Sequence, residues 1–244
     1  SYGNKDAIYW TRLIIKFFIA PKEPKKESRL KMYFNNQQEL QDYFKDSTLS
    51  MAKNSSVEIG KDVVLGKMIN FSGVCKIGYG TKIEGQNTLK TVEFGAGNLI
   101  KANSQISNAC AGNSNIFGPF CYVRNNCIVG DNNIIGAYVE ATRSTFGCNT
   151  KVSHRAFLGD AFIEDGVIIG AGVIFCNWDG KQHQKSTVRK NAIIGSGSLL
   201  ISPIMIGERA IVGAGSTLSK DVAPNLKIIQ RRETTQLFNG LDEK

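Results

Sequence analysis

The sequence predicts an all-β protein whose main domain is a parallel β-helix. Beginning at Ile59, an apolar residue recurs every six positions, and this period continues, with short slips, as far as Leu218. A period of six fits neither an α-helix nor an alternating strand. It is the period of hexapeptide solenoids, in which three hexads form one triangular coil of about 18 residues. The residues expected to face inward are Ile59, Leu65, Phe71, Ile77, Ile83, Leu89, Phe94, Ile100, Ile106, Phe117, Val123, Val129, Ile135, Phe146, Val152, Leu158, Ile163, Ile169, Ile194, Leu200, Ile206, Val212 and Leu218.

Glycine and other small residues agree with this interpretation. Glycine often follows the inward residue, as in Ile77-Gly78, and small residues such as Thr81 and Ser216 lie four places after one. The corners of a triangular coil need backbone that turns without a bulky side chain. We therefore expect hexapeptide repeats over residues 55–222, which corresponds to roughly nine coils.

Two shorter regions flank the repeats. Residues 1–54 form an N-terminal extension, and residues 223–244 form a C-terminal tail that begins with Ala223-Pro224. Helix is expected only in these flanking regions. Residues 36–46 read as a short helix with Asn36 as its N-cap.

An apolar segment stands near the start of the chain. Residues 7–20 are apolar and aromatic but contain Arg12 and Lys16, so the segment is too short and too charged to span a bilayer. A basic stretch follows it. One interpretation is an amphipathic segment within residues 1–35 that lies on an anionic membrane surface. We favour the other, a strand or helix that packs on the β-helix or on a neighbouring subunit.

The net charge of +9 is compatible with a solvated surface or with attraction for a polyanionic small molecule. Basic residues do not alternate with aromatic ones and no nucleic-acid motif is present, so a nucleic-acid partner is not expected. Six cysteines without a Cys-x-x-Cys pair, and no signal-peptide pattern, indicate reduced thiols and a cytoplasmic protein, with association with the inner membrane surface left open. Only His154 and His183 are present, so no metal centre is expected.

Residues that could carry chemistry concentrate between 140 and 196. His154 lies two positions after the inward Val152, so the repeat places it outside the core. The period stops in the polar stretch 181–190 and resumes at Ile194. An interruption of this kind is usually a surface loop, and loops often carry binding groups.

Residues 118–232 resemble the acetyltransferase domain of the bifunctional enzyme N-acetylglucosamine-1-phosphate uridyltransferase/glucosamine-1-phosphate N-acetyltransferase. The resemblance implies a left-handed β-helix, acetyl-CoA as co-substrate, and a homotrimer with active sites at the subunit boundaries. The uridyltransferase domain of that family has no counterpart in the 54 residues that precede the repeats. The family patterns are GPF…R (Gly118, Pro119, Phe120, Arg124), FVE (Tyr138-Val139-Glu140), H…YLGDA (His154 and 157–161), NIGAGTITCNYDG (168–180), GS (Gly195-Ser196) and GAGS (213–216).

The resemblance also implies roles for individual residues. His154 would be the general base, Glu140 would orient it, and Asn177 would position the amine nucleophile. Ser196, with backbone amides such as that of Ala171, would contact the thioester and pantetheine end of acetyl-CoA. Ala214 and Arg231 would lie farther along the surface that binds coenzyme A. On the acceptor side, Arg124 would face an acidic group.

Several acceptor positions depart from the family pattern. The family holds its sugar phosphate with a Lys, a Tyr and an Asn where this chain has Thr142, Phe157 and Ile168, and His183 replaces another Lys. Arg143 is a candidate substitute for the first of these lysines. Because each lost charge-assisted contact costs about 1.5–3 kcal/mol, we expect a changed acceptor.

The sequence therefore predicts an acetyl-CoA-dependent N-acetyltransferase that acts on an amino sugar, either a sugar phosphate or a nucleotide-linked sugar. Two alternatives stay open: an O-acetyltransferase that acts on a sugar hydroxyl, and a non-catalytic hexapeptide scaffold. Cys176 stands beside Asn177, but an acyl-cysteine intermediate is not expected, since binding both substrates side by side supplies proximity.

Overall fold

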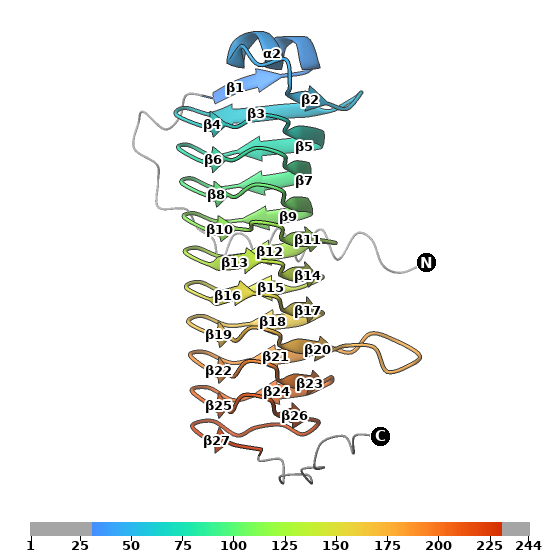
Figure 1. Cartoon of the computed structure of the whole chain (residues 1–244), viewed down its shortest axis with the longest axis vertical. Helices are drawn as coiled ribbons and strands as arrows, with labels where there is room; N and C mark the ends of the chain where they lie inside the picture. The colour runs from blue at the N-terminus through green and yellow to red at the C-terminus, as the bar shows by residue number, and fades with distance from the viewer. Residues whose placement is uncertain (1–30, 231–244) are drawn as a thin grey trace, which may run out of the picture.

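The computed structural model describes residues 31–230 of the 244-residue chain and shows a left-handed parallel β-helix of about ten turns (Figure 1). The predicted fold class is thus confirmed. Residues 1–30 and 231–244 lie outside the description. The apolar segment at 7–20, with its membrane and packing alternatives, therefore lies outside the described residues, as does Arg231.

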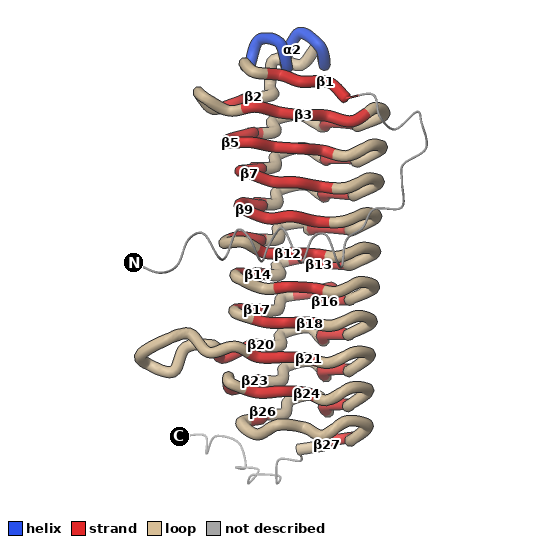
Figure 2. Tube along the Cα trace, turned by 180° about the vertical axis from the view of Figure 1, so that it is seen from behind, coloured by secondary structure: helices blue, strands red, loops and turns tan. Residues whose placement is uncertain are grey.

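The turns stack into a three-sided prism (Figures 1 and 2). One side is a ten-stranded parallel sheet. It consists of β4 (Val64–Leu65), β6 (Lys82–Ile83), β8 (Leu99–Ile100), β10 (Ile116–Phe117), β13 (Ile134–Ala137), β16 (Lys151–His154), β19 (Ile168–Ile169), β22 (Ile193–Ile194), β25 (Ile211–Val212) and β27 (Lys227–Ile228).

The other two sides are joined near the N-terminus, where single long strands bend around their common corner. These strands are β5 (Asn70–Ile77), β7 (Thr88–Phe94) and β9 (Gln105–Ala111), and β9 pairs with both β11 and β12. The second side comprises β2 (Ser50–Met51), β11 (Tyr122–Arg124), β14 (Glu140–Thr142), β17 (Phe157–Gly159), β20 (Ile174–Cys176), β23 (Leu199–Ile201) and β26 (Thr217–Leu218). The third comprises β3 (Ser56–Gly60), β12 (Cys127–Val129), β15 (Thr145–Phe146), β18 (Ala161–Ile163), β21 (Ser186–Val188) and β24 (Ile204–Ile206).

The core is the column of apolar side chains that the six-residue period predicts. Every predicted inward residue is buried except Leu65 at the N-terminal end, which is partly buried against the same core. All six cysteines are free, and Cys75, Cys121 and Cys127 are buried. Because each turn pairs with the next in register, the hydrophobic column and the backbone ladders form together.

The N-terminal end of the prism is closed by β1 (Lys31–Phe34) and α2 (Gln37–Phe44). β1 runs antiparallel to β3 and covers the edge of the sheet. The Asn36 side chain accepts from the backbone N–H of Glu39, and Glu39 accepts in return from the N–H of Asn35. This reciprocal cap explains where the helix begins. The helix predicted over residues 36–46 is present, and its Leu40 is buried.

Parallel pairing extends beyond the range that the period suggested. β2 begins at Ser50, and β27 ends at Ile228 and pairs with β25. Parallel pairing thus continues for about a third of a turn beyond residues 55–222 at each end, where apolar residues do not follow the period strictly. Among the described residues, no helix has the length and apolar character needed to cross a membrane.

Buried asparagines connect successive turns along one corner. Asn98, Asn115 and Asn133 lie in consecutive turns, and the side-chain oxygen of each accepts from the backbone N–H of the equivalent residue in the next turn. The Asn133 side chain also donates to the Gly147 carbonyl. These bonds satisfy polar groups that the corner would otherwise bury unpaired.

Replacing Asn133 with Ala should therefore lower the free energy of unfolding by about 1–3 kcal/mol for each buried group left unpaired. The groups are the Thr150 N–H, the Thr150 hydroxyl and the Gly147 carbonyl. Urea unfolding followed by circular dichroism measures the change. Lys82→Ala, on an exposed position of β6, is the control and should stay within about 0.5 kcal/mol of the wild type. Equal stability of the two variants would contradict this account of the corner.

Candidate active site

His154 lies at the corner between the ten-stranded side and the second side of the prism. It ends β16, it is exposed, and it pairs in register with Ala137 of the preceding turn. The register aligns Val152, Ile169, Ile194 and Val212 in successive turns. The residues two positions later are His154, Ala171, Ser196 and Ala214, so the predicted base and three residues predicted to contact acetyl-CoA form one column, which we call the donor column.

The donor column presents unused backbone donors. At each corner, the N–H that bonds to the previous turn belongs to the residue that follows the column residue. Gly172 donates to the Arg155 carbonyl, Gly197 to the Ala171 carbonyl and Gly215 to the Ser196 carbonyl. The N–H groups of Ala171, Ser196 and Ala214 therefore have no acceptor among the described residues. All three residues are exposed. A Cβ built on Gly197 or Gly215 would meet nothing within 4 Å, so the surface is open beside them.

A recess of about 500 Å³ borders the same corner on the second side of the prism. Tyr138, Glu140, Arg155, Ala156, Phe157 and Ile174 line it. Glu140, Phe157 and Ile174 are stacked in register on β14, β17 and β20. Two of the predicted site residues, Glu140 and Phe157, are thus brought together in a recess of a size typical for small-molecule sites.

Arg124 and Glu140 form an ion pair at this recess. Arg124 Nη2 lies 2.6 Å from Glu140 Oε1, and its guanidinium lies 5.2 Å from the centre of the Tyr122 ring. His154 makes no hydrogen bond to Glu140 or to any other described residue. The role of Glu140 in orienting His154 therefore stays a prediction, and the partner that Glu140 has here is Arg124.

A second cluster lies at the opposite corner of the same side and centres on Asp160. The Arg143 guanidinium donates to both carboxylate oxygens of Asp160, at 2.7 and 2.9 Å. The Asn177 side-chain nitrogen donates to Oδ2 at 2.6 Å. His183 Nδ1 lies 3.5 Å from the same oxygen. Arg143, which the sequence offered as a substitute for a missing lysine, is thus held by a carboxylate.

Asp160, the centre of this cluster, was not among the residues that the sequence singled out. Burial by itself would raise its pKa, but the hydrogen bonds from Arg143 and Asn177 outweigh burial and hold the pKa below its usual value. Only 10% of its side chain is exposed. The spacing contained a signal, since Arg143, Asp160 and Asn177 follow one another at intervals of 17 residues, about one coil.

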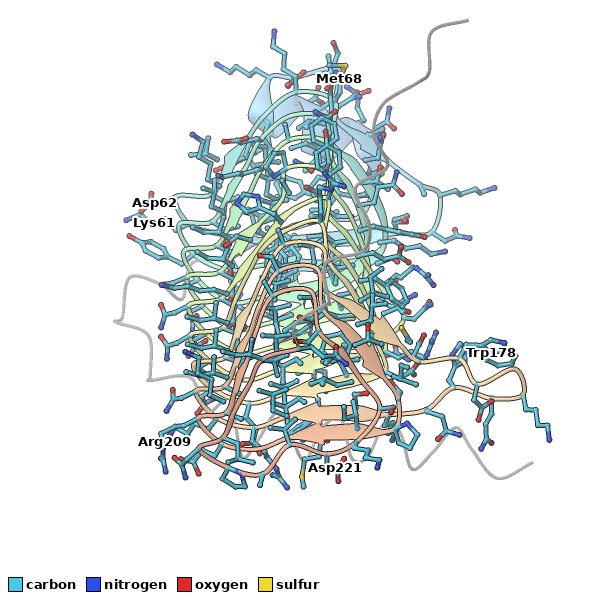
Figure 3. The ribbon with its side chains drawn as sticks, turned by 60° about the horizontal axis from the view of Figure 1, so that its bottom comes forward. Lys61, Asp62, Met68, Trp178, Arg209 and Asp221 are labelled. Carbon is cyan, nitrogen blue, oxygen red and sulfur yellow. The ribbon has the colours of Figure 1, made fainter. Side chains whose placement is uncertain are left out.

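The Asp160 cluster lies at the base of a projecting loop. Residues 177–185 leave the prism between β20 and β21, as all three figures show, with Trp178 on the projecting part (Figure 3). Trp178 bridges to His183, and their rings lie 5.0 Å apart. Asp179 accepts from the backbone N–H groups of Lys181 and Gln182, which closes the turn. The interruption predicted at 181–190 is therefore an ordered loop in its first half.

The structure does not bring all the predicted residues together within one chain. His154 and Asn177 stand at opposite corners of the second side, separated by β17, which corresponds to about 10 Å of strand. Ile168 lies outward on the ten-stranded side, away from the recess. Thr142 is buried, and its hydroxyl accepts from Asn125 and Arg143.

Comparisons with known proteins agree with this fold. The family described as bacterial transferase hexapeptide (six repeats) matches residues 112–143. The bifunctional protein GlmU of Synechococcus sp. (strain CC9605) is 36% identical over 182 residues, which is 75% of this chain and 40% of that protein. That of Wigglesworthia glossinidia brevipalpis is 37% identical over 172 residues, covering 70% of this chain and 37% of that protein.

The family match over residues 112–143 agrees with the hexapeptide repeats of the β-helix. The chain spans about 40% of the length of the curated relatives it matches. Among solved structures, the UDP-N-acetylglucosamine acyltransferase LpxA from Bacteroides fragilis matches with a TM-score of 0.51 at 18% identity, covering 75% of this chain and 69% of that chain. At that identity the likeness concerns the fold alone.

Two further features of the hexapeptide-repeat domain bear on its chemistry. Burial raises the pKa of the Cys176 thiol, which disfavours the thiolate needed for nucleophilic attack. A second, largely apolar recess of about 370 Å³ is lined by residues such as Ile128, Cys148 and Phe162 on the third side, and it contains no predicted site residue. Among residues 31–230, no three His, Cys, Asp or Glu side chains gather as a possible metal site.

Asp160→Asn should destabilise the hexapeptide-repeat domain in a pH-dependent way. Because folding lowers the pKa of Asp160, its ionised form stabilises the fold above the unfolded value of about 3.9, and this contribution is lost as the pH falls through the folded pKa. We expect a loss of about 1–3 kcal/mol at pH 7 that shrinks toward zero below about pH 4. Urea unfolding between pH 3 and 7 measures it.

The control for that titration is Asp62→Asn. Asp62 is exposed and has no hydrogen bond or ion pair with the described residues, and asparagine suits its positive φ of 60°. Its effect on stability should be small and independent of pH. A pH-independent effect of Asp160→Asn would contradict the ionised cluster.

Proposed function

We propose that this chain is an acetyl-CoA-dependent N-acetyltransferase that acts on an amino sugar. The observation that carries the proposal is the position of His154, at the junction between the donor column and the recess. An acyl donor on one side and an amine on the other would meet at its imidazole. The curated relatives are bifunctional GlmU proteins, which agrees with acetyl transfer to an amino sugar.

The donor column fits coenzyme A chemistry. When bound, acetyl-CoA supplies a thioester carbonyl at the end of a pantetheine arm that contains two amides. The free N–H groups of Ala171, Ser196 and Ala214 can donate to the arm's carbonyl oxygens, and exposed small residues leave room for it. One such N–H aimed at the thioester oxygen stabilises the negative charge that develops there, an effect worth about 3 kcal/mol in other enzymes.

His154 acts as the general base. An amine attacks a carbonyl only when it is unprotonated, and imidazole is the side-chain base that changes charge near neutral pH. His154 is exposed and has no hydrogen bond to another described residue, so a ring nitrogen is available to the acceptor. Glu140, which lines the adjoining recess, would stabilise the imidazolium that forms.

Asn177 would complete the site from a neighbouring copy of the chain. Its side-chain nitrogen is used by Asp160, so its carbonyl oxygen is the atom left to accept from an amine N–H. Since His154 and Asn177 stand at opposite corners of one prism, a site that uses both requires two chains. This supports the homotrimer that the family resemblance implies, with the 177–185 loop reaching across each boundary.

Transfer is direct in this proposal. The raised pKa of the Cys176 thiol makes an acyl-cysteine intermediate unfavourable, and two substrates bound side by side need none. The acceptor differs from glucosamine 1-phosphate because Thr142 is buried and Arg143 is occupied by Asp160. Since acetyl-CoA is made and used in the cytoplasm, we assign the reaction to that compartment.

The proposal predicts that His154→Ala lowers kcat by about 10²–10⁴-fold, because the proton of the amine then has no acceptor. The release of CoA from acetyl-CoA is measured against a panel of amino sugars, sugar phosphates and nucleotide-linked amino sugars. Cys176→Ser is the matched control and should retain activity. Undiminished transfer by His154→Ala would refute the assigned base, and loss of transfer in Cys176→Ser would indicate a covalent route.

The same panel separates the alternatives. An amide product resists hydroxylamine, whereas an O-acetyl ester is cleaved by it, so treating the product distinguishes N- from O-acetylation. Best turnover with glucosamine 1-phosphate would refute the changed acceptor. Absence of CoA release with every acceptor, together with no binding of acetyl-CoA, would leave the scaffold alternative.

A further inference from the structure

We propose that Arg155 binds the phosphate group of a phosphorylated amino-sugar acceptor. The inference rests on the proposed function, because it names what distinguishes the acceptor in the recess beside His154. Neither the sequence pattern nor the comparisons assign a role to Arg155. It follows His154 directly, it is exposed, and it lines the 500 Å³ recess with Tyr138, Glu140 and Phe157.

The other arginines near the acceptor side already have carboxylate partners. Arg124 is paired with Glu140 at 2.6 Å, and Arg143 holds Asp160 through two hydrogen bonds. The Arg155 backbone bonds to the neighbouring turns, but its guanidinium makes no hydrogen bond or ion pair with any described residue. A guanidinium in a recess without a partner is the group available to an incoming anion, and its planar fork matches phosphate geometry.

The charge at the recess also favours an anion. Glu140 also lines it and would repel an anion if its charge were free. The Arg124 guanidinium compensates that charge directly. The three groups together, Arg124, Glu140 and Arg155, therefore carry one net positive charge, which favours an anionic acceptor over a neutral one.

The backbone conformation at this corner also distinguishes the turns beside the recess. Equivalent corner positions in successive turns all have positive φ, and glycine occupies the later ones, Gly172, Gly197 and Gly215. Asn103, at an earlier one, also suits this conformation. The two earliest turns carry Met68 and Gln86 at this position, and three consecutive turns beside the recess carry Phe120 at 56°, Tyr138 at 57° and Arg155 at 41°, the bulkiest run of side chains along the corner.

These three side chains form a continuous surface. The Phe120 and Tyr138 rings are stacked, with centroids 5.1 Å apart and planes 3° apart, and they are 46% and 61% exposed. Arg155 lies one turn farther along, about 5 Å in the direction of stacking. A phosphate held by Arg155 would leave the aromatic pair beside whatever the phosphate carries, so the acceptor is either a sugar 1-phosphate or a nucleoside-diphosphate sugar whose base contacts Tyr138.

The test uses glucosamine, glucosamine 1-phosphate and UDP-linked glucosamine as probe acceptors for the full chain, and glucosamine 1-phosphate stands here for the class of amino-sugar 1-phosphates rather than for the preferred acceptor. Arg155→Gln should raise KM for the phosphorylated acceptors by roughly 10- to 100-fold, because one charge-assisted contact is lost. It should leave kcat, KM for acetyl-CoA and the kinetics with glucosamine within about threefold of the wild type. Arg155→Lys should recover part of the loss. Lys151→Gln, on an exposed position of the same strand β16, removes equal charge outside the recess and should change KM by less than threefold.

Tyr138→Asn distinguishes the two sources of phosphate. Asparagine tolerates the positive φ at this position but has no ring. A higher KM than the wild type's for UDP-linked glucosamine alone assigns the nucleotide, and KM values that stay at the wild-type level for both phosphorylated acceptors assign the sugar 1-phosphate. Equal effects of Arg155→Gln with and without phosphate, or a higher KM for acetyl-CoA, would overturn the inference.

Equilibrium binding of the two phosphorylated sugars, measured by isothermal titration without acetyl-CoA, separates this inference from the proposed function. If the wild type acetylates no amino sugar but Arg155→Gln still weakens binding at least tenfold, the proposed function fails and the anion site stands. If the wild type transfers acetyl groups but binds phosphorylated and plain glucosamine equally, the function stands and the assignment of Arg155 fails.

Discussion

Parallel pairing between successive turns places every side chain of the candidate site. Each turn is in register with the next, so residues about 17 or 18 positions apart become neighbours about 4.8 Å apart. The donor column of His154, Ala171, Ser196 and Ala214 is one line of such neighbours, although the projecting loop lengthens the interval between Ala171 and Ser196, and Arg143, Asp160 and Asn177 form another. The apolar core and the buried Asn98–Asn115–Asn133 corner hold this register, so chemistry on the surface depends on packing within the prism.

The two corners of the second side differ in character. At the His154 corner, backbone N–H groups and the Arg155 guanidinium have no partners among the described residues, which suits the binding of two small molecules. At the Asp160 corner, polar groups are bonded to one another, which fixes the Asn177 amide and the base of the projecting loop. An open corner on one chain and an ordered loop on another are complementary parts of the boundary that we propose between subunits.

Much of this arrangement could be predicted from the sequence. Because the period is fixed, residues one coil apart in the sequence become paired neighbours in successive turns. The inward residues, the helix at Asn36 and the exposure of His154 all followed from the pattern. The hydrogen-bond partners could not be predicted in the same way. Arg143 was expected at the acceptor, but a carboxylate one coil later captures it, and Glu140 bonds Arg124 while His154 stays free of it. Which partner a side chain bonds depends on the length of the side chain and on competition between nearby groups, and the six-residue period carries no information on either. The slips in the period also concealed that His154 and Asn177 belong to opposite corners.

The central claim is that His154 stands where the donor column meets the acceptor recess. The most direct measurement is a crystal structure of the full chain with coenzyme A bound. The account predicts the pantetheine arm along Ala171, Ser196 and Ala214, with the sulfur beside the His154 imidazole and the nucleotide end toward the C-terminal turns. Coenzyme A bound in the recess lined by Tyr138 and Phe157, or with its sulfur remote from His154, would contradict it.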